Sequence, residues 1–277
     1  MKKRILAALL VFVALLTGCS RKETTGQWPS QKIEIDVCYT AGGTADTVAR
    51  QLSALMSQQL STTFNLVNVT GGSGSIAGQQ VYAAAHDGYT WLGDVAHTVS
   101  GWRTLGYADL GWEDFYGFYA ASSPYVLFVS GNSPYQTAQQ LFDAMRGDPS
   151  MKWGNAGLGS INQLTGSLML EKLGLKGNSV PYDGGRSAAI KVVAGEVTWS
   201  WCGLSDILDL AQSGDIRILG ICDSSPREID CAKGKYTVPS LLDDYPELSD
   251  LQGLLYWGFR VSRDTPADAV AKIRDAF

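Results

Sequence analysis

Strand patterns alternate with helical patterns along the first third of the chain, and this alternation constrains the fold more than any other feature. Residues 32–39 alternate apolar and polar side chains, which is typical of a strand. Apolar residues then fall on one helical face over 45–60, and strands are predicted at 64–69 and 89–92, with a short helix at 76–85 between them. This order predicts an α/β fold with a mostly parallel sheet covered by helices.

The alternation returns in the middle third, so the chain contains a second α/β unit. A strongly β-prone run at 125–130 is followed by a helical pattern at 137–145. Later elements follow in the same style, with strands at 152–155, 180–182, 197–201, 216–221 and 256–261, and helices at 161–173 and 187–194. Pro266 opens a final helix, a position where its missing N–H is not needed.

The first nineteen residues are organised like a bacterial targeting signal. Three positive residues at 2–4 precede an uncharged apolar run at 5–16, which is shorter than the ~20 residues that span a bilayer. The run ends in Leu16-Thr17-Gly18-Cys19, which resembles the lipobox of bacterial lipoproteins. By that resemblance Cys19 is lipidated and becomes the mature N-terminus; the alternative is a plain secretory signal. Residues 20–30 would then be a flexible tether.

Composition excludes several classes of protein. With 45% hydrophobic residues and a net charge of -5, the 277-residue chain can bury a core, which excludes intrinsic disorder. Removal of the signal would change this charge to -8. A pI near 5.1 argues against nucleic-acid binding, which needs clustered Lys and Arg. With 2 His and no closely spaced pair of Cys, we expect no metal site and no cofactor.

Four cysteines follow the signal, in a compartment that permits disulfides. Cys222 and Cys231 flank a polar stretch that contains Pro226, and this pair is the candidate disulfide. Cys38 and Cys202 lie in apolar strand-like runs, so we expect them to be buried thiols.

Two Gly-rich turns, at residues 40–43 and 156–160, each join a predicted strand to a predicted helix. Ligands of open α/β sheets bind at the carboxyl ends of strands, where helix N-termini present unpaired N–H groups. Two such turns that face each other across a cleft would clamp an anion without Arg or Lys. The alternative is that each turn is only a tight connection.

These turns belong to a series of motifs that resembles the Bug family, the extracytoplasmic solute-binding proteins of tripartite tricarboxylate transporters. Residues 39–50 are similar to its first signature, and Trp-Gly-Asn-Ala-Gly-Leu-Gly-Ser at 153–160 is similar to its second Gly loop. The other matches follow in order at 68–78, 87–90, 180–185, 194–197, 213–218 and 257–266. Family members usually continue well past the last motif, whereas this chain stops at Phe277, so we expect it to be short at the C-terminus.

The resemblance implies a two-lobed Venus-flytrap fold with a ligand cleft. Lobe one would comprise residues 31–125 and 226–277, and lobe two residues 126–225. The protein would be a monomer that closes on a small carboxylate by a hinge motion and hands it to membrane transporter subunits. A sensor that presents its ligand to a membrane receptor is the alternative.

The resemblance also implies which residues bind the ligand. Two loops would meet its carboxylate groups, the first through Thr40, Ala41, Gly42 and Gly43, and the second through Gly157, Leu158, Gly159 and Ser160.

Five further residues have a possible role in the cleft and a plainer alternative. Asp46 would orient the first loop or pair with an amino group, or simply be a favourable charge in the first turn of a helix. His97 and Thr98 would line the cleft, although His97 also suits a surface loop. Tyr182 would wall the pocket or join the core, and Arg186 would pair with a second carboxylate or stay solvated.

The sequence supports an enzymatic function less well than solute binding. Residues 72–77 fit the spacing of a dinucleotide-binding fingerprint, and Asp94 follows at the distance of a ribose ligand. A single fingerprint is weak, however, and an extracytoplasmic protein meets little dinucleotide. The chain contains no Gly-x-Ser-x-Gly elbow, and its two histidines, His86 and His97, leave few choices for the triad of a serine hydrolase. We therefore expect no enzymatic activity and no catalytic residues.

Overall fold

The computed structural model describes residues 28–232 and 234–277. The first third forms the predicted parallel unit, in which β1 (Ile33–Val37) pairs with β2 (Phe64–Asn68) on one side and β3 (Thr90–Val95) on the other. The helices α2 (Thr44–Leu60) and α3 (Ser75–Ala83) connect these strands. The predicted α/β class is therefore confirmed.

The other elements follow in chain order. The strands are β4 (Phe115–Ser130), β5 (Lys152–Asn155), β6 (Asn178–Pro181), β7 (Trp199–Gly203), β8 (Ile216–Ile221), β9 (Arg227–Cys231), β10 (Gly234–Val238) and β11 (Leu254–Ser262). The helices are α4 (Trp102–Leu105), α5 (Ala138–Gly147), α6 (Ile161–Lys172), α7 (Gly185–Val193), α8 (Leu208–Ser213), α9 (Leu241–Asp244) and α10 (Ala267–Ala276). Short 3-10 turns lie between them, among them η1 (Gly72–Gly74) and η5 (Pro246–Leu251).

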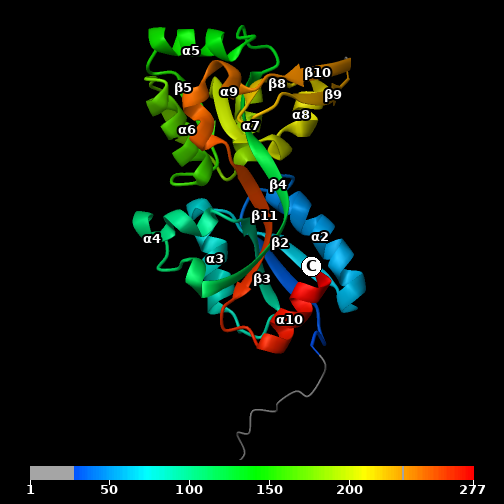
Figure 1. Cartoon of the computed structure of the whole chain (residues 1–277). Coiled ribbons are helices and arrows are strands. Elements are labelled where there is room, and N and C mark those ends of the chain that lie inside the picture. The colour runs from blue at the N-terminus through cyan, green and yellow to red at the C-terminus, as the bar shows by residue number, and fades with distance from the viewer. Residues whose placement is uncertain (1–27, 233) are drawn as a thin grey trace, which may run out of the picture.

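One nine-stranded sheet runs through both halves of the molecule, in the order β2-β1-β3-β11-β4-β7-β5-β6, with β8 also paired to β4. The 16-residue strand β4 belongs to both halves, because its first part pairs with β11 and its last residues pair with β7 and β8. Figure 1 shows β4 and β11 as the two strands that pass between a lobe with α2, α3 and α10 and a lobe with α5 to α9.

The chain returns to lobe one later than residue 226, where the sequence placed the boundary. The hairpin of β9 and β10 packs on α8 and β8, and η5 packs on α6, so these elements accompany lobe two. The apolar side chains of Ile229 and Val238 join the core of that lobe, which explains the placement. We therefore propose that the second crossing between the lobes is made by β11 (Figure 1).

Buried aromatic pairs hold the strands of each lobe together. In lobe two, Trp153 of β5 lies opposite Trp199 of β7, and their rings stack with centroids 5.1 Å apart. In lobe one, Trp91 of β3 packs against Phe259 of β11 at 5.4 Å. Such pairs contribute roughly 0.5–1.5 kcal/mol beyond the area that they bury. They also fix which strands become neighbours.

The described cysteines are all free thiols, so Cys222 and Cys231 do not form the candidate disulfide. The reason is their direction: Cys231 Sγ faces the carbonyl of Ala211 in α8, and Cys222 Sγ faces the carbonyl of Leu248 in η5. Cys38 and Cys202 are buried, as predicted.

The proposed lipidation site Cys19, the targeting signal and most of the tether lie outside the described residues. Within residues 28–232 and 234–277, no helix combines the length and the apolar character that crossing a bilayer requires.

Asp36 on β1 gives lobe one a pH-dependent stability. Burial, together with the like charge of Glu34, raises the pKa of Asp36 from 3.8 to about 6. The ionised form therefore opposes folding above pH 6, and this penalty disappears as the pH falls through 6 toward 4. We expect Asp36→Asn to raise the free energy of unfolding by about 1–3 kcal/mol at pH 8 and by little near pH 4, measured by urea denaturation. An equal gain at both pH values would contradict this explanation.

Candidate functional site

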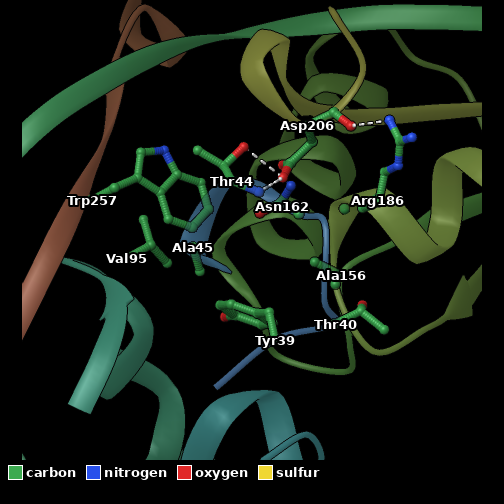
Figure 2. A pocket seen from close by; sticks show the side chains of 13 residues that line it. Tyr39, Thr40, Thr44, Ala45, Val95, Ala156, Asn162, Arg186, Asp206 and Trp257 are labelled. Atoms are coloured by element: carbon green, nitrogen blue, oxygen red, sulfur yellow. Dashed lines mark hydrogen bonds between the residues drawn. The ribbon is translucent and has the colours of Figure 1, made fainter. Parts of the chain in front are cut away.

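Two cavities lie side by side between the lobes and share Tyr39 and Ala156 in their walls. The inner cavity has a volume of about 10 Å³, and residues of both lobes surround it (Figure 2). The outer cavity has a volume of about 390 Å³ and lies between η1 of lobe one and the 156–158 loop of lobe two. The outer cavity therefore has room for a small organic ligand, and the inner cavity has room for one water-sized group.

Three helices that begin at these cavities have glycine at the N-cap. Gly43 precedes α2 and Gly184 precedes α7 at the inner cavity, and Gly74 precedes α3 at the outer cavity. None of the three has a side-chain cap, in contrast to α6, where the hydroxyl of Ser160 accepts a hydrogen bond from the amide of Gln163. Helix N-termini present N–H groups and partial positive charge to an anion. The first amide of α2, that of Thr44, donates to Asp206, and the first amide of α3, that of Ser75, donates to the carbonyl of Gly72.

Hydrogen bonds join the lobes directly around the cavities. The amide and hydroxyl of Thr40 donate to the carbonyl of Asp183, and the hydroxyl of Ser73 donates to the carbonyl of Leu158 at 2.7 Å. The amide of Thr44 donates to Asp206 Oδ1 at 3.0 Å, and its hydroxyl donates to the same atom at 2.7 Å. The first Gly-rich turn thus meets the loop at Asp183, the second meets the turn at Ser73, and the lobes are in contact.

Asp206 brings a buried carboxylate into this interface. Its side chain lines the inner cavity, and the residue is only 4% exposed. Burial raises the pKa of Asp206 above its ordinary value, although the hydrogen bonds from Thr44 and the charge of Arg186 act in the opposite direction. Arg186 itself pairs with the carboxylate of Asp209, at 2.8 Å from Nη2 to Oδ2, and also donates to the backbone carbonyl of Asp206. Its guanidinium group is therefore engaged within lobe two.

Asp46 is fully bonded inside lobe one. Its carboxylate accepts hydrogen bonds from the amide of Gly42, from the side chain of Asn68 and from Arg50. Burial acts to raise the pKa of Asp46, but these hydrogen bonds outweigh it and the pKa is lowered. This geometry fits the orientation of the first loop rather than contact with a ligand amino group.

The structure places five of the expected ligand-binding residues at the cavities. Thr40 and Gly43 line the inner cavity, and Gly157, Leu158 and Tyr182 line the outer cavity. Tyr182 also packs against the apolar core of lobe two.

Other expected site residues lie elsewhere. Ala41 and Gly42 are exposed on the loop, and Ser160 is buried as the cap of α6. Gly159 lies against Leu105 of α4, on the opposite lobe. Neither cavity includes His97 or Thr98. Thr98 packs under the loop against Gly74. Burial, together with the charge of Arg260, lowers the pKa of His97.

The sequence analysis missed Thr44, Asn162, Asp206 and Trp257, which all line the inner cavity. Asp206 follows the carboxyl end of β7 by three residues, and this position was a usable signal. Trp257 had no such signal, because β11 enters the sheet antiparallel to β3 from the far end of the chain.

Asp94 cannot bind the ribose of a dinucleotide, as the dinucleotide-enzyme hypothesis requires. It is fully buried, and its Oδ2 accepts a hydrogen bond from Arg260 Nε at 2.7 Å. A carboxylate in this position cannot reach a ribose.

Within the described residues, no group of three or more His, Cys, Asp and Glu could hold a metal ion.

A model of the family described as "Tripartite tricarboxylate transporter family receptor" matches residues 48–233. The chain belongs to this family. The Bug resemblance of the sequence motifs is thereby confirmed, and the receptor family is one of solute-binding proteins.

Known relatives of the receptor agree with this assignment. A UPF0065 protein of Pseudomonas sp. strain P51, from the tcbD–tcbE intergenic region, is 29% identical over 201 residues, which cover 71% of this chain and 59% of that protein. The chain thus spans less than two thirds of the length of that curated relative.

Solved structures share the fold of the receptor. The malate-bound MatC protein of Rhodopseudomonas palustris is 21% identical and superposes with a TM-score of 0.78, covering 90% of this chain and 84% of MatC. An adipate-bound protein of R. palustris is 24% identical, with a TM-score of 0.78 over 90% of this chain and 83% of that protein. The periplasmic-binding-protein fold is therefore confirmed.

Proposed function

We propose that the receptor is an extracytoplasmic lipoprotein that captures a small carboxylate between its lobes and delivers it to the membrane subunits of a tripartite tricarboxylate-type transporter. The observation that carries this proposal is the set of glycine-capped helix N-termini that open on the interlobe cavities. Gly74, the N-cap of α3, lies in the wall of the outer cavity together with Gly157 and Leu158 of lobe two.

The outer cavity suits a carboxylate for a physical reason. Helix N-termini stabilise anions through amide N–H groups and the helix dipole, without a cationic side chain. The cavity wall contains glycines of both lobes, so the backbone can approach a ligand closely. Its volume of about 390 Å³ also falls in the range of small-molecule sites.

Two proteins of the same fold support the ligand class. MatC was solved with malate and a second R. palustris protein with adipate, which are both small dicarboxylates. We propose the same class for this receptor, bound by a monomer that closes its lobes around the ligand and is anchored through Cys19 by the lipobox-like sequence.

The proposal predicts ligand-dependent thermal stability of residues 20–277. A carboxylate present at 100 times its Kd should raise the free energy of unfolding by about 2.7 kcal/mol. We expect a melting-temperature rise of roughly 5–10 °C for the bound acid, and no rise for its uncharged diamide. Ligand binding should also change the fluorescence of the eight tryptophans, because one of them, Trp257, lies in the inner cavity wall.

Malate, succinate, adipate and citrate form the first panel, each compared with its diamide or triamide. A cooperative transition that no acid shifts would overturn the proposed ligand class. An equal shift by acids and amides would instead show that the negative charge is not what the cleft recognises.

A further inference from the structure

A carboxylate of lobe two binds the first turn of a helix in lobe one. Thr44, the first residue of α2, donates its amide hydrogen to Asp206 Oδ1 at 3.0 Å and its hydroxyl hydrogen to the same atom at 2.7 Å (Figure 2). Both residues are buried, and 162 positions separate them in the chain. Hydrogen bonds to a charged acceptor are stronger than those between neutral groups, and these two cross from one lobe to the other.

Lobe two holds Asp206 in position for this contact. A side-chain carbon on Gly185, the first residue of α7, would lie 2.5 Å from Asp206 Oδ2, so this oxygen faces its own lobe while Oδ1 faces α2. Arg186 donates to the backbone carbonyl of Asp206, and its positive charge stabilises the ionised carboxylate. The two oxygens are thus divided between the two lobes.

The segment that carries Asp206 is bonded to a strand that passes between the lobes. Asp206 ends the 3-10 turn η4 (Leu204–Asp206), in which the amide of Ser205 donates to the hydroxyl of Ser123 in β4 at 3.0 Å. The hydroxyl of Ser205 also lies 2.9 Å from that of Thr44. The contact between Thr44 and Asp206 is therefore connected to the crossing strand β4 through a single residue.

Closure of the cleft makes this contact, and opening breaks it. Water can replace both partners when the lobes separate, whereas removal of one partner leaves the other buried and unsatisfied in the closed form. Such a change therefore penalises the closed form alone. Of the described residues, those that line the outer cavity do not include Thr44 or Asp206, and the inner cavity has room for one water-sized group.

We infer that Asp206 is a positioning residue, which forms with Thr44 a latch that holds the lobes closed and so sets the affinity for the solute without contact to it. A ligand that binds the closed form gains from the latch, because its apparent affinity depends on the fraction of receptor in that form. This inference rests on the proposed function, because it assumes that the lobes close around a solute.

Two variants remove the latch from opposite lobes. Thr44→Val removes the hydroxyl donor at nearly constant shape, and Asp206→Ala removes the acceptor. We expect each variant to bind about ten- to a hundredfold more weakly than the wild type, through faster dissociation, measured by surface plasmon resonance. The probe is the acid among malate, succinate, adipate and citrate that raises the melting temperature of the wild type most.

Thr137→Val is the matched control for these variants. Thr137 caps α5 by accepting a hydrogen bond from the amide of Gln140, and both residues belong to lobe two. We expect this variant to lose stability and to bind the probe as the wild type does. A cooperative melting transition establishes that each variant is folded.

The double variant Thr44→Val/Asp206→Ala tests whether the two residues act as one unit. It should lose no more affinity than the weaker-binding single variant, because both changes remove the same contact. Losses that multiply would show two independent effects and would overturn the inference.

Small-angle X-ray scattering without any acid separates the latch from the proposed ligand class. We expect a larger radius of gyration for Thr44→Val and Asp206→Ala than for the wild type and Thr137→Val, because the lobes of the first two are apart more of the time. Equal radii in all four proteins, or unchanged affinity in both latch variants, would overturn the inference and leave the proposed function standing. The expected radii in a protein that binds none of the four acids would overturn the proposed ligand class and leave the latch standing.

Discussion

Arg260→Ala is expected to lower the free energy of unfolding by about 3–5 kcal/mol, because it leaves the carboxylate of Asp94 buried without its partner. The pair joins β11 to β3 and is 1% and 0% exposed at its two side chains. Arg260 also donates to the carbonyl of Ala96, and its guanidinium carbon lies 4.5 Å from the ring centroid of Trp112. These contacts tie β11 into lobe one.

Urea denaturation of the variant and the wild type measures this loss. The exposed pair of Arg146 and Asp143, with side chains 51% and 59% exposed, is the control, and Arg146→Ala should cost about 0–1 kcal/mol. The double variant Asp94→Leu/Arg260→Met should recover most of the loss, because apolar residues of similar volume avoid the desolvation of two charges. A loss below about 1 kcal/mol for Arg260→Ala would contradict the explanation.

Gly159→Val is expected to weaken ligand binding by about ten- to a hundredfold by holding the lobes apart. The first side-chain carbon at this position would overlap Cδ1 of Leu105, which belongs to the opposite lobe. Gly159 also has a φ of +74°, so any larger residue adds backbone strain within lobe two. The effect on binding must therefore be separated from the effect on stability.

Gly195→Val is the matched control, because Gly195 has a φ of +77° in the same lobe and nothing lies within 4 Å of an added carbon. We expect both variants to lose similar stability, and only Gly159→Val to lose affinity for the carboxylate found by thermal shift. Truncation of the half-exposed Leu105 to alanine should restore part of the affinity of Gly159→Val. Equal affinities of the two glycine variants would show that this contact does not limit closure.

Many elements could be predicted from the sequence because local patterns determine them. The predicted strand at 216–221 coincides with β8, and the predicted helix at 161–173 differs from α6 by one residue. The start of β4 and the hairpin of β9 and β10 were missed. Their residues carry weak local signals, and they become strands because distant or later segments pair with them.

The candidate site, too, could be predicted from the sequence only in part. The Gly-rich turns were predicted from the sequence, since a turn between strand and helix needs specific residues at specific positions. Asp46 could be proposed to orient the first loop because its partner Gly42 lies four residues away, and the hydrogen bond between them fits that alternative. The disulfide between Cys222 and Cys231 was a possibility that spacing allowed and side-chain direction excluded.

The sequence by itself determined the α/β class, the two Gly-rich turns and the family to which the chain belongs. Only the tertiary structure decided that Asp206 of lobe two meets Thr44 of lobe one, 162 residues away, and that Leu105 covers Gly159. The physical reason is that a helix N-terminus and a turn are local properties of the chain, whereas the group that faces them depends on how two lobes pack across a long β4 and β11.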